Sequence, residues 1–101
     1  MILYNITVSI EKAAEPEWLQ WIKKVYVPSV MQSELFERHS VYRLLNETEG
    51  DDTSYALQFY AKDLSKLEEY LELHAPAILE AHNTRYKYRH VSFMTVLEEV
   101  S

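Results

Sequence analysis

The sequence predicts an α+β fold of the ferredoxin-like class, a four-stranded antiparallel sheet with two helices on one face. Stretches of alternating apolar and polar residues indicate one strand at the start of the chain, two in the middle and one at the end. Stretches with helical spacing lie between the first two strands and between the last two. The element order is therefore β-α-β-β-α-β. A length of 101 residues fits one domain over 1–101.

The first strand is expected over Met1–Ile10, where β-branched and aromatic side chains occupy every second position. A helix should begin near Glu15, because Pro16 suits a first helical turn and Trp18 starts an apolar stripe. Pro28 has no amide hydrogen and crowds the preceding turn. We expect the helix to kink there, or to stop and restart.

Two strands joined by a hairpin are expected next. They cover Phe36–Asn46 and Ser54–Ala61. The segment between them, Glu47–Asp52, is polar and acidic and contains Gly50, the only glycine of the chain. This composition predicts a hairpin tip.

The second helix has two candidate capping residues. Asp63 can cap it, or Ser65 can do so in a capping box with Glu68. Pro76 should bend the helix in its second half.

The last strand is expected over Val91–Leu97. The strand side chains expected to face the helices are Tyr4, Ile6, Val8, Tyr55, Leu57, Phe59, Val91 and Phe93. The opposite face then carries the apolar side chains Leu3, Ala56, Tyr60, Met94 and Val96. Because a contiguous apolar patch of this size usually marks an interface, we expect a homodimer packed through this open sheet face.

The composition excludes several functions. The chain has no cysteine, which excludes disulfides, thiolate metal sites and cysteine nucleophiles. A single glycine does not suffice for a dinucleotide or phosphate loop, and we expect no cofactor. No apolar run approaches the length of a membrane helix and no signal-peptide pattern is present, so we expect a cytoplasmic protein that does not bind membranes.

The four histidines do not predict a metal site. His74 and His82 share the second helix but lie eight residues apart, about 12 Å along its axis. That separation is too large for two ligands of one ion. We therefore expect no metal.

A small-ligand pocket between the helices and the sheet is the functional interpretation of the aromatic residues. Its candidate walls, and the polar residues that continue toward the helix end, are Trp18, Trp21, Tyr26, Tyr60, His82 and Arg85. His74 and Tyr26 are the candidate acids or bases. The alternative is that the tryptophans are ordinary core residues, which we prefer; for Tyr26 and His74 both interpretations stay open.

One basic stretch, Arg85–His90, has aromatic residues between its cations. Such a stretch can bind single-stranded nucleic acid, but cations at a helix C-terminus also complement the helix dipole. With a net charge of −6, we expect no nucleic-acid partner. A small anionic or aromatic ligand near Arg85, Arg89 and Arg43 is the preferred partner besides a second copy of the chain.

Five segments carry a resemblance to a known family. They are Ile2–Val8, Trp18–Trp21 leading to Pro28, Tyr55–Phe59, Leu73–Pro76 and Val91–Val100. In this order they resemble an uncharacterised bacterial family, a domain of unknown function. That family is similar to the dimeric α/β-barrel superfamily, which contains cofactor-independent monooxygenases and isomerases.

The resemblance implies a ferredoxin-like fold and a dimer, but no activity. Several relatives have a histidine two residues before the first-helix proline, where this chain has Tyr26. Two hypotheses therefore stay open. The preferred one is a homodimeric small-ligand-binding or interaction module. The other is a cofactor-independent monooxygenase or isomerase acting on a small aromatic or acidic metabolite, which needs an enclosed cavity of roughly 300 Å³ beside His74 or Tyr26.

Overall fold

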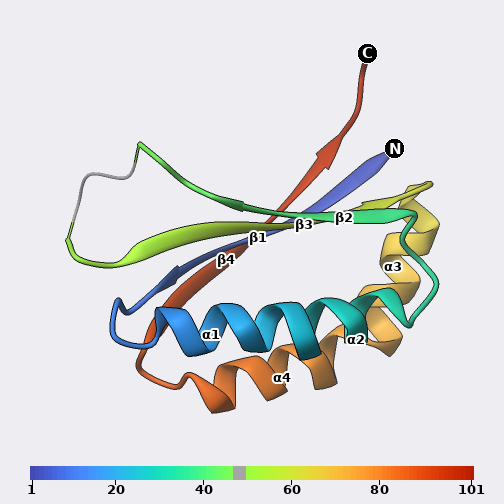
Figure 1. Cartoon of the computed structure of the whole chain (residues 1–101). Helices are drawn as coiled ribbons and strands as arrows, with labels where there is room; N and C mark the ends of the chain where they lie inside the picture. The colour runs from blue at the N-terminus through green and yellow to red at the C-terminus, as the bar shows by residue number, and fades with distance from the viewer. Residues whose placement is uncertain (47–49) are drawn as a thin grey trace.

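The computed structural model describes residues 1–46 and 50–101. The elements in chain order are β1 (Ile2–Ile10), α1 (Glu15–Trp21), the π-helical turn η1 (Ile22–Tyr26), α2 (Val27–Met31), β2 (Arg38–Arg43), β3 (Thr53–Ala61), α3 (Leu64–Leu73), α4 (Ala75–Arg85) and β4 (His90–Glu98). α1, η1, α2 and α4 lie on one face of the sheet, and α3 stands at one end of it (Figure 1). The predicted order of strands and helical regions is confirmed.

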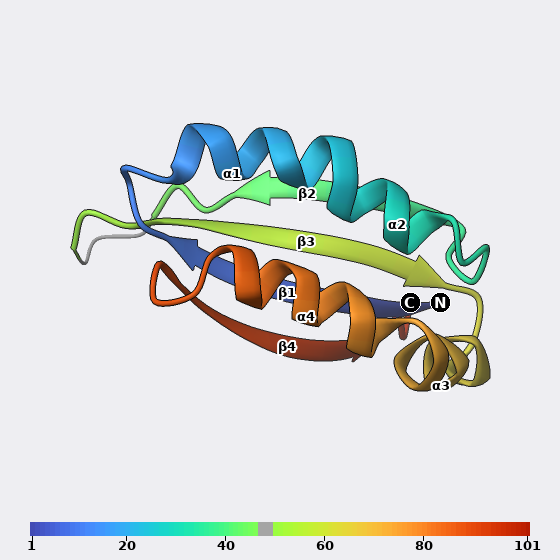
Figure 2. The ribbon, with the colours of Figure 1, turned by 90° about the horizontal axis from the view of Figure 1, so that it is seen from below.

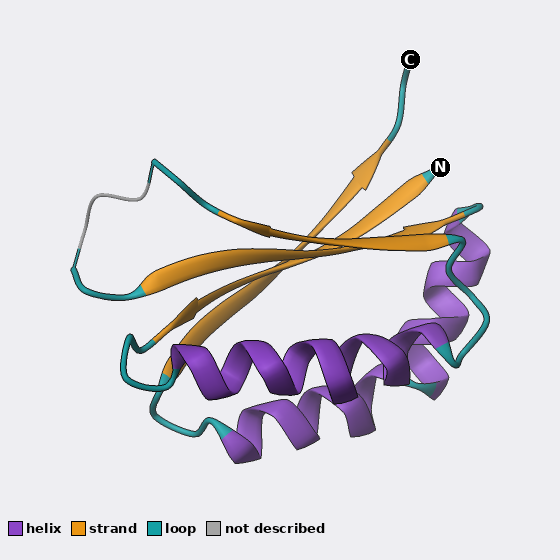
Figure 3. Cartoon of the chain, in the orientation of Figure 1, coloured by secondary structure: helices purple, strands orange, loops and turns teal. Residues whose placement is uncertain are grey.

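The sheet has the strand order β2-β3-β1-β4, and every neighbouring pair is antiparallel. Each helical connection joins two strands that flank a third, since β3 separates β1 from β2 and β1 separates β3 from β4. Seen from the helical side, α1 and α2 run beside β2 and β3, while α4 runs along β1 and leaves β4 at the edge (Figure 2). No helix covers the opposite face, which we call the outer face (Figure 3). This arrangement confirms the ferredoxin-like α+β class.

The first helical region does not stop at Pro28. The amide of Val27 bonds to the carbonyl of Ile22, five residues back, which gives the wider turn η1. Pro28 comes next and has no amide hydrogen, so it needs no backbone acceptor in the turn. The hydroxyl of Ser29 donates to the carbonyl oxygen of Val25 at 2.7 Å. The wide turn makes room for the proline ring, so the helix continues from α1 into α2.

The second helical region is interrupted more strongly than predicted. Asp63 is its cap and accepts a bond from the Lys66 amide at 3.0 Å, while Ser65 donates to the same carboxylate. At His74 the backbone departs from helical geometry, with φ −119°, and a new helix starts there. Pro76 fits the first turn of α4 because its missing amide hydrogen would have no intrahelical partner at that position.

The register of β4 corrects the predicted faces of that strand. Met94 pairs with Ile6, and Phe93 pairs with Thr7. Because residues directly opposite each other in an antiparallel pair share a face, Met94 is on the helical side with Ile6, and Phe93 is on the outer face with Thr7. The prediction was wrong for Val91, Phe93, Met94 and Val96. Both strand faces are apolar, so alternation alone does not identify the buried one.

The hairpin strands are also placed differently at their ends. β2 covers only part of Phe36–Asn46, and Phe36 packs in the core with its ring 5.9 Å from that of Tyr4. Of the predicted tip, residues 47–49 lie outside the described part of the chain. Gly50 has φ +72°, which suits glycine.

No helix within the described ranges has the length and apolar character needed to span a membrane.

The packing of α3 gives a first prediction. Leu67 is buried against the sheet, whereas Leu64, one turn earlier, is half exposed. Leu67→Ala should lower the free energy of unfolding by about 2–5 kcal/mol, because it leaves a cavity in the core. Leu64→Ala, measured in the same urea titration, should lower it by less than about 1 kcal/mol. Equal losses in the two variants would contradict this placement of α3.

Candidate functional site

His82 lies at the centre of an aromatic cluster between the sheet and the helices. The indole N–H of Trp18 donates to Nε2 of His82 at 2.9 Å. The ring centres of Trp21, Tyr26 and Tyr86 lie 5.9, 5.8 and 5.3 Å from the centre of the imidazole ring. The structure thus brings together four of the predicted site residues, from α1, η1 and α4, and adds Tyr86 from the end of α4.

The hydrogen bonds of His82 determine its protonation state. Because Nε2 accepts from Trp18, this nitrogen carries a lone pair, and the ring proton is on Nδ1, 3.0 Å from Oδ1 of Asn83. Burial lowers the pKa of His82; the hydrogen bond to Asn83 acts against this shift, and the nearby His90 imidazole adds to it. Burial also lowers the pKa of His90, whose ring centre is 4.7 Å away. Both imidazoles are therefore held in the neutral form.

Tyr26 points into this cluster from the π-helical turn. Burial raises its pKa well above the usual range, and the phenols of Tyr4 and Tyr70 raise it further. The hydroxyls of Tyr4 and Tyr70 are buried and have no hydrogen-bond partner among the described residues. A phenol with a raised pKa stays protonated at neutral pH, so Tyr26 can donate a hydrogen bond but is a poor base.

Arg85 is already paired. Its guanidinium bonds to the carboxylate of Glu17 on α1, and the hydroxyl of Tyr86 donates to the same carboxylate at 2.7 Å. Hydrogen bonds from Tyr86 and Arg85 lower the pKa of Glu17. Arg89 forms an ion pair with Glu11, with 3.7 Å between Nε of the arginine and Oε2 of the glutamate. Because both arginines have carboxylate partners, they are weak candidates for holding an anionic ligand.

Two predicted site residues lie apart from the cluster. His74 occupies the junction of α3 and α4, half-buried, with its ring stacked on Tyr70 at 6.0 Å. Tyr60 pairs with Leu3 in the sheet and is on the outer face, opposite the side that Trp18 packs against. It therefore cannot be a wall of the interior pocket that the sequence suggested.

The interior beside His82 is nearly filled. The space lined by Tyr26, Leu57, His82 and Ser92 has a volume of about 10 Å³. This is about one water molecule, far from the roughly 300 Å³ that a substrate pocket needs. A groove of about 190 Å³ runs over Tyr26 between the first helical region and α4, but it opens on the outside of the helical layer.

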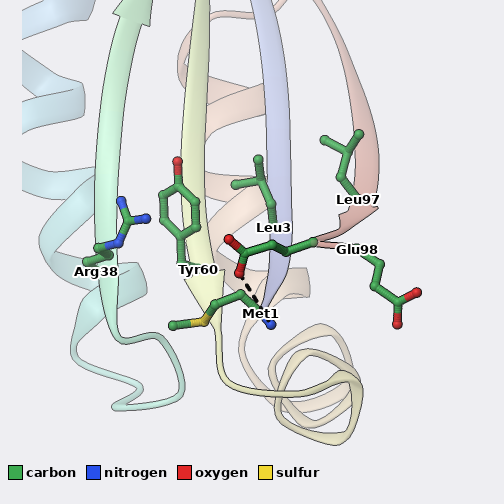
Figure 4. A pocket seen from close by; sticks show the side chains of 7 residues that line it. Met1, Leu3, Arg38, Tyr60, Leu97 and Glu98 are labelled. Atoms are coloured by element: carbon green, nitrogen blue, oxygen red, sulfur yellow. Dashed lines mark ion pairs between the residues drawn. The ribbon is translucent and has the colours of Figure 1, made fainter. Parts of the chain in front are cut away.

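A larger pocket lies on the outer face at one end of the sheet. Its volume is about 220 Å³. Its floor is one row of directly paired residues across all four strands: Arg38, Tyr60, Leu3 and Leu97 (Figure 4). Met1, Glu98 and Glu99 complete its rim. Since the predicted fold placed Leu97 on the helical side, the sequence did not indicate this row.

The next row of the outer face, Ser40, Gln58, Asn5 and Thr95, is polar, and hydrogen bonds connect two of its members to the neighbouring rows. The Tyr60 hydroxyl donates to Oε1 of Gln58 at 3.1 Å, and the Gln58 amide donates to Oδ1 of Asn5 at 3.2 Å. Asn5 in turn donates to the Thr7 hydroxyl at 3.1 Å. We call this chain of bonds the outer-face ladder. It fixes the Tyr60 side chain, so the pocket floor has a defined shape.

The described parts of the chain contain no group of three His, Asp or Glu side chains that could hold a metal ion.

Sequence reasoning did not single out Tyr86 or Arg38. Tyr86 lies within the basic stretch and is identified by its burial, whereas Arg38 is identified only through its pairing with Tyr60.

Comparison with known proteins gives a family and a fold. Residues 1–100 match the model of the family described as "Domain of unknown function (DUF4286)". No curated protein matches the chain. Among solved structures, a Deinococcus radiodurans protein assigned as an antibiotic biosynthesis monooxygenase has 14% identity and a TM-score of 0.74, covering 100% of this chain and 94% of its own.

Two further structures have the same fold. A dimeric ferredoxin-like protein from an uncultured marine organism has 12% identity and a TM-score of 0.71, with 100% and 96% of the two chains covered. An "ethyl tert-butyl ether d (ethd) family protein" from Bacillus halodurans has 12% identity and a TM-score of 0.71, with 99% and 100% covered. At these identities the likeness shows a shared ferredoxin-like fold. The predicted resemblance to a family of unknown function with this fold is confirmed.

The buried histidine predicts a pH-dependent stability. The pKa of His82 is lower in the folded chain than the value near 6.5 expected after unfolding. The unfolded chain therefore binds the proton first as the pH falls. Stability should be full above about pH 7.5 and fall as the pH drops through 6.5, by at most about 1.4 kcal/mol per pH unit for one histidine.

Urea unfolding followed by tryptophan fluorescence between pH 8 and pH 5, at fixed protein concentration, measures this slope. His82→Gln keeps an acceptor for Trp18 but takes up no proton, so part of the slope should disappear. His39→Gln, on an exposed strand position, should leave the slope unchanged. A full slope in His82→Gln would exclude His82 as its source.

Proposed function

The chain belongs to the DUF4286 family, whose description names no activity, and we propose that it is a homodimeric module that binds a small ligand, with two copies packed outer face to outer face. The distribution of charge on the sheet carries this proposal. The chain has sixteen Asp and Glu residues, and within residues 1–46 and 50–101 none of them occupies an outward-facing strand position. Arg38 is the only charged residue there. Two copies with a net charge of −6 each can therefore approach through this face without opposing carboxylates.

Apolar exposure on the same face supports the proposal. Val91 is 71% exposed, Phe93 60% and Tyr42 56%, and all three project from the outer side of the sheet. Strands of nine residues are about 30 Å long, and four strands are about 19 Å wide. Because the side chains add to the flat area of the sheet, the accessible area of such a face is comparable to the area of about 800 Å² that each partner buries in a standard interface.

The edge strand β4 points to the same conclusion. Its outer-face residues Val91 and Phe93 are exposed, and on the helical side Met94 and Val96 are 51% and 42% exposed. A strand that is apolar on both faces and lies at a sheet edge is prone to pair with other chains. A second copy placed over the outer face would cover one of these two surfaces. The dimeric name of the marine neighbour is consistent with this assembly.

Catalysis is the weaker hypothesis. The name of the Deinococcus neighbour suggests monooxygenase chemistry, but only its fold is shared at 14% identity. The interior space beside His82 and Tyr26 is about 10 Å³, too small for a substrate. We therefore do not extend the proposal to a monooxygenase or isomerase reaction.

Sedimentation equilibrium tests the dimer. The 12.0 kDa chain should sediment at twice its mass at micromolar concentration. Phe93→Glu places a carboxylate from each copy on an apolar part of the proposed interface, and it should shift the protein to monomer by weakening association at least a hundredfold.

Leu73→Glu is the matched control, because Leu73 is also exposed, at 66%, but lies at the end of α3, away from the outer face. It should leave the dimer intact. A monomer mass for the unmodified chain, or a dimer that persists in Phe93→Glu, would refute packing through the outer face.

A further inference from the structure

The geometry points to the outer-face pocket as a binding site for a small carboxylate with an apolar body, closed on its open side by the second copy. This inference deepens the proposed homodimer and rests on it only for the closing wall. The floor of the site is the row Arg38, Tyr60, Leu3 and Leu97, and its volume is about 220 Å³.

Arg38 supplies the group that recognises the carboxylate. Its guanidinium carbon lies 3.7 Å from the centre of the Tyr60 ring. In the described chain Arg85 and Arg89 each have a carboxylate within 4.0 Å, whereas Arg38 has none. A guanidinium stacked on an aromatic ring keeps its edge N–H groups free, and these donate in pairs to a carboxylate. The side chain is therefore held in place with its donors unused.

The remaining floor selects an apolar body. Leu3 and Leu97 are neighbours in the same row, so they present a continuous aliphatic surface beside the Tyr60 ring. The Tyr60 hydroxyl is directed away from the row, toward Gln58. A ligand that places its carboxylate at Arg38 thus has its apolar part over the two leucines. A short aromatic or branched aliphatic acid fits this division of polar and apolar surface.

The two acidic residues at the rim do not neutralise Arg38. The side chain of Glu98 extends away from the guanidinium (Figure 4). Glu99 lies 3.9 Å from the amino group of Met1 and makes its ion pair there. Neither carboxylate is within 4.0 Å of Arg38.

The position of the pocket connects binding to assembly. Its floor residues are on the outer face, which is the side that a second copy would cover. Covering the site would remove water from the ion pair between Arg38 and the ligand, and this strengthens the attraction. We therefore expect tighter binding to the dimer than to the monomer.

Benzoate is a suitable probe, and benzamide is its uncharged control of the same shape. Titration of each into protein with labelled methyl groups should show benzoate shifting the resonances of Leu3 and Leu97 and binding at least tenfold more tightly than benzamide. Arg38→Gln should weaken benzoate binding at least tenfold. Lys24→Gln, which removes an exposed cation of η1 on the helical side, should leave it unchanged. Equal affinities for the two probes, or unchanged binding in Arg38→Gln, would overturn the site.

The oligomeric mass of each variant separates the two proposals. If the chain is a dimer and benzoate does not bind, the carboxylate site is wrong and the dimer stands. If the chain is a monomer and benzoate still binds through Arg38, the site stands and the dimer is wrong. If Arg38→Gln weakens dimerisation while benzoate causes no shift, Arg38 is a contact for the second copy itself, for instance for its Glu98 or Glu99, and the ligand site is overturned.

Discussion

The double pairing of β1 is the constraint on which the rest of the structure depends. β1 bonds to β3 along one edge and to β4 along the other, over its full length. This register decides which side chain of every strand faces the helices. A shift of one residue would exchange the two faces, placing Tyr4 and Ile6 outside and Asn5 and Thr7 against the helices. The same alignment determines which side chains form the core, where His82 lies between the sheet and the helices, and which row forms the outer pocket.

The helical side and the outer side of the sheet have different chemistry as a result. On the helical side, Trp18 and His82 meet in a hydrogen bond that joins α1 to α4, and aromatic rings fill the surrounding space. That side is built for stability, since a neutral imidazole there satisfies an indole donor that would otherwise be buried without a partner. On the outer side the members of the ladder are bonded to one another, while Arg38 has no carboxylate partner among the described residues and apolar groups are left uncovered.

The fold was predictable from the sequence to the level of element order, because β1 alternates cleanly and proline and aspartate mark the helix starts. The faces of β4 were not. Val91 and Phe93 are as apolar as Met94 and Val96, so periodicity fits either choice, and only pairing with β1 decides. Four members of the candidate site were identified by residue type. Their tight packing was not predictable, because free volume depends on how rings interlock. Arg38 was missed since its role arises from a neighbour 22 positions later, Tyr60.

The outer-face ladder has a consequence for the identity of the partner. Tyr60, Gln58 and Asn5 each donate a hydrogen bond to the next member of the ladder, which ends at the accepting hydroxyl of Thr7. Burying such a row between two sheets costs free energy unless the facing surface has polar groups opposite it. A second copy of the chain presents that row by symmetry. A chain of the same fold with aliphatic residues at these positions does not, and would leave amide groups unsatisfied. In the proposed dimer, the ladder would favour a second copy of the chain over other proteins of this common fold.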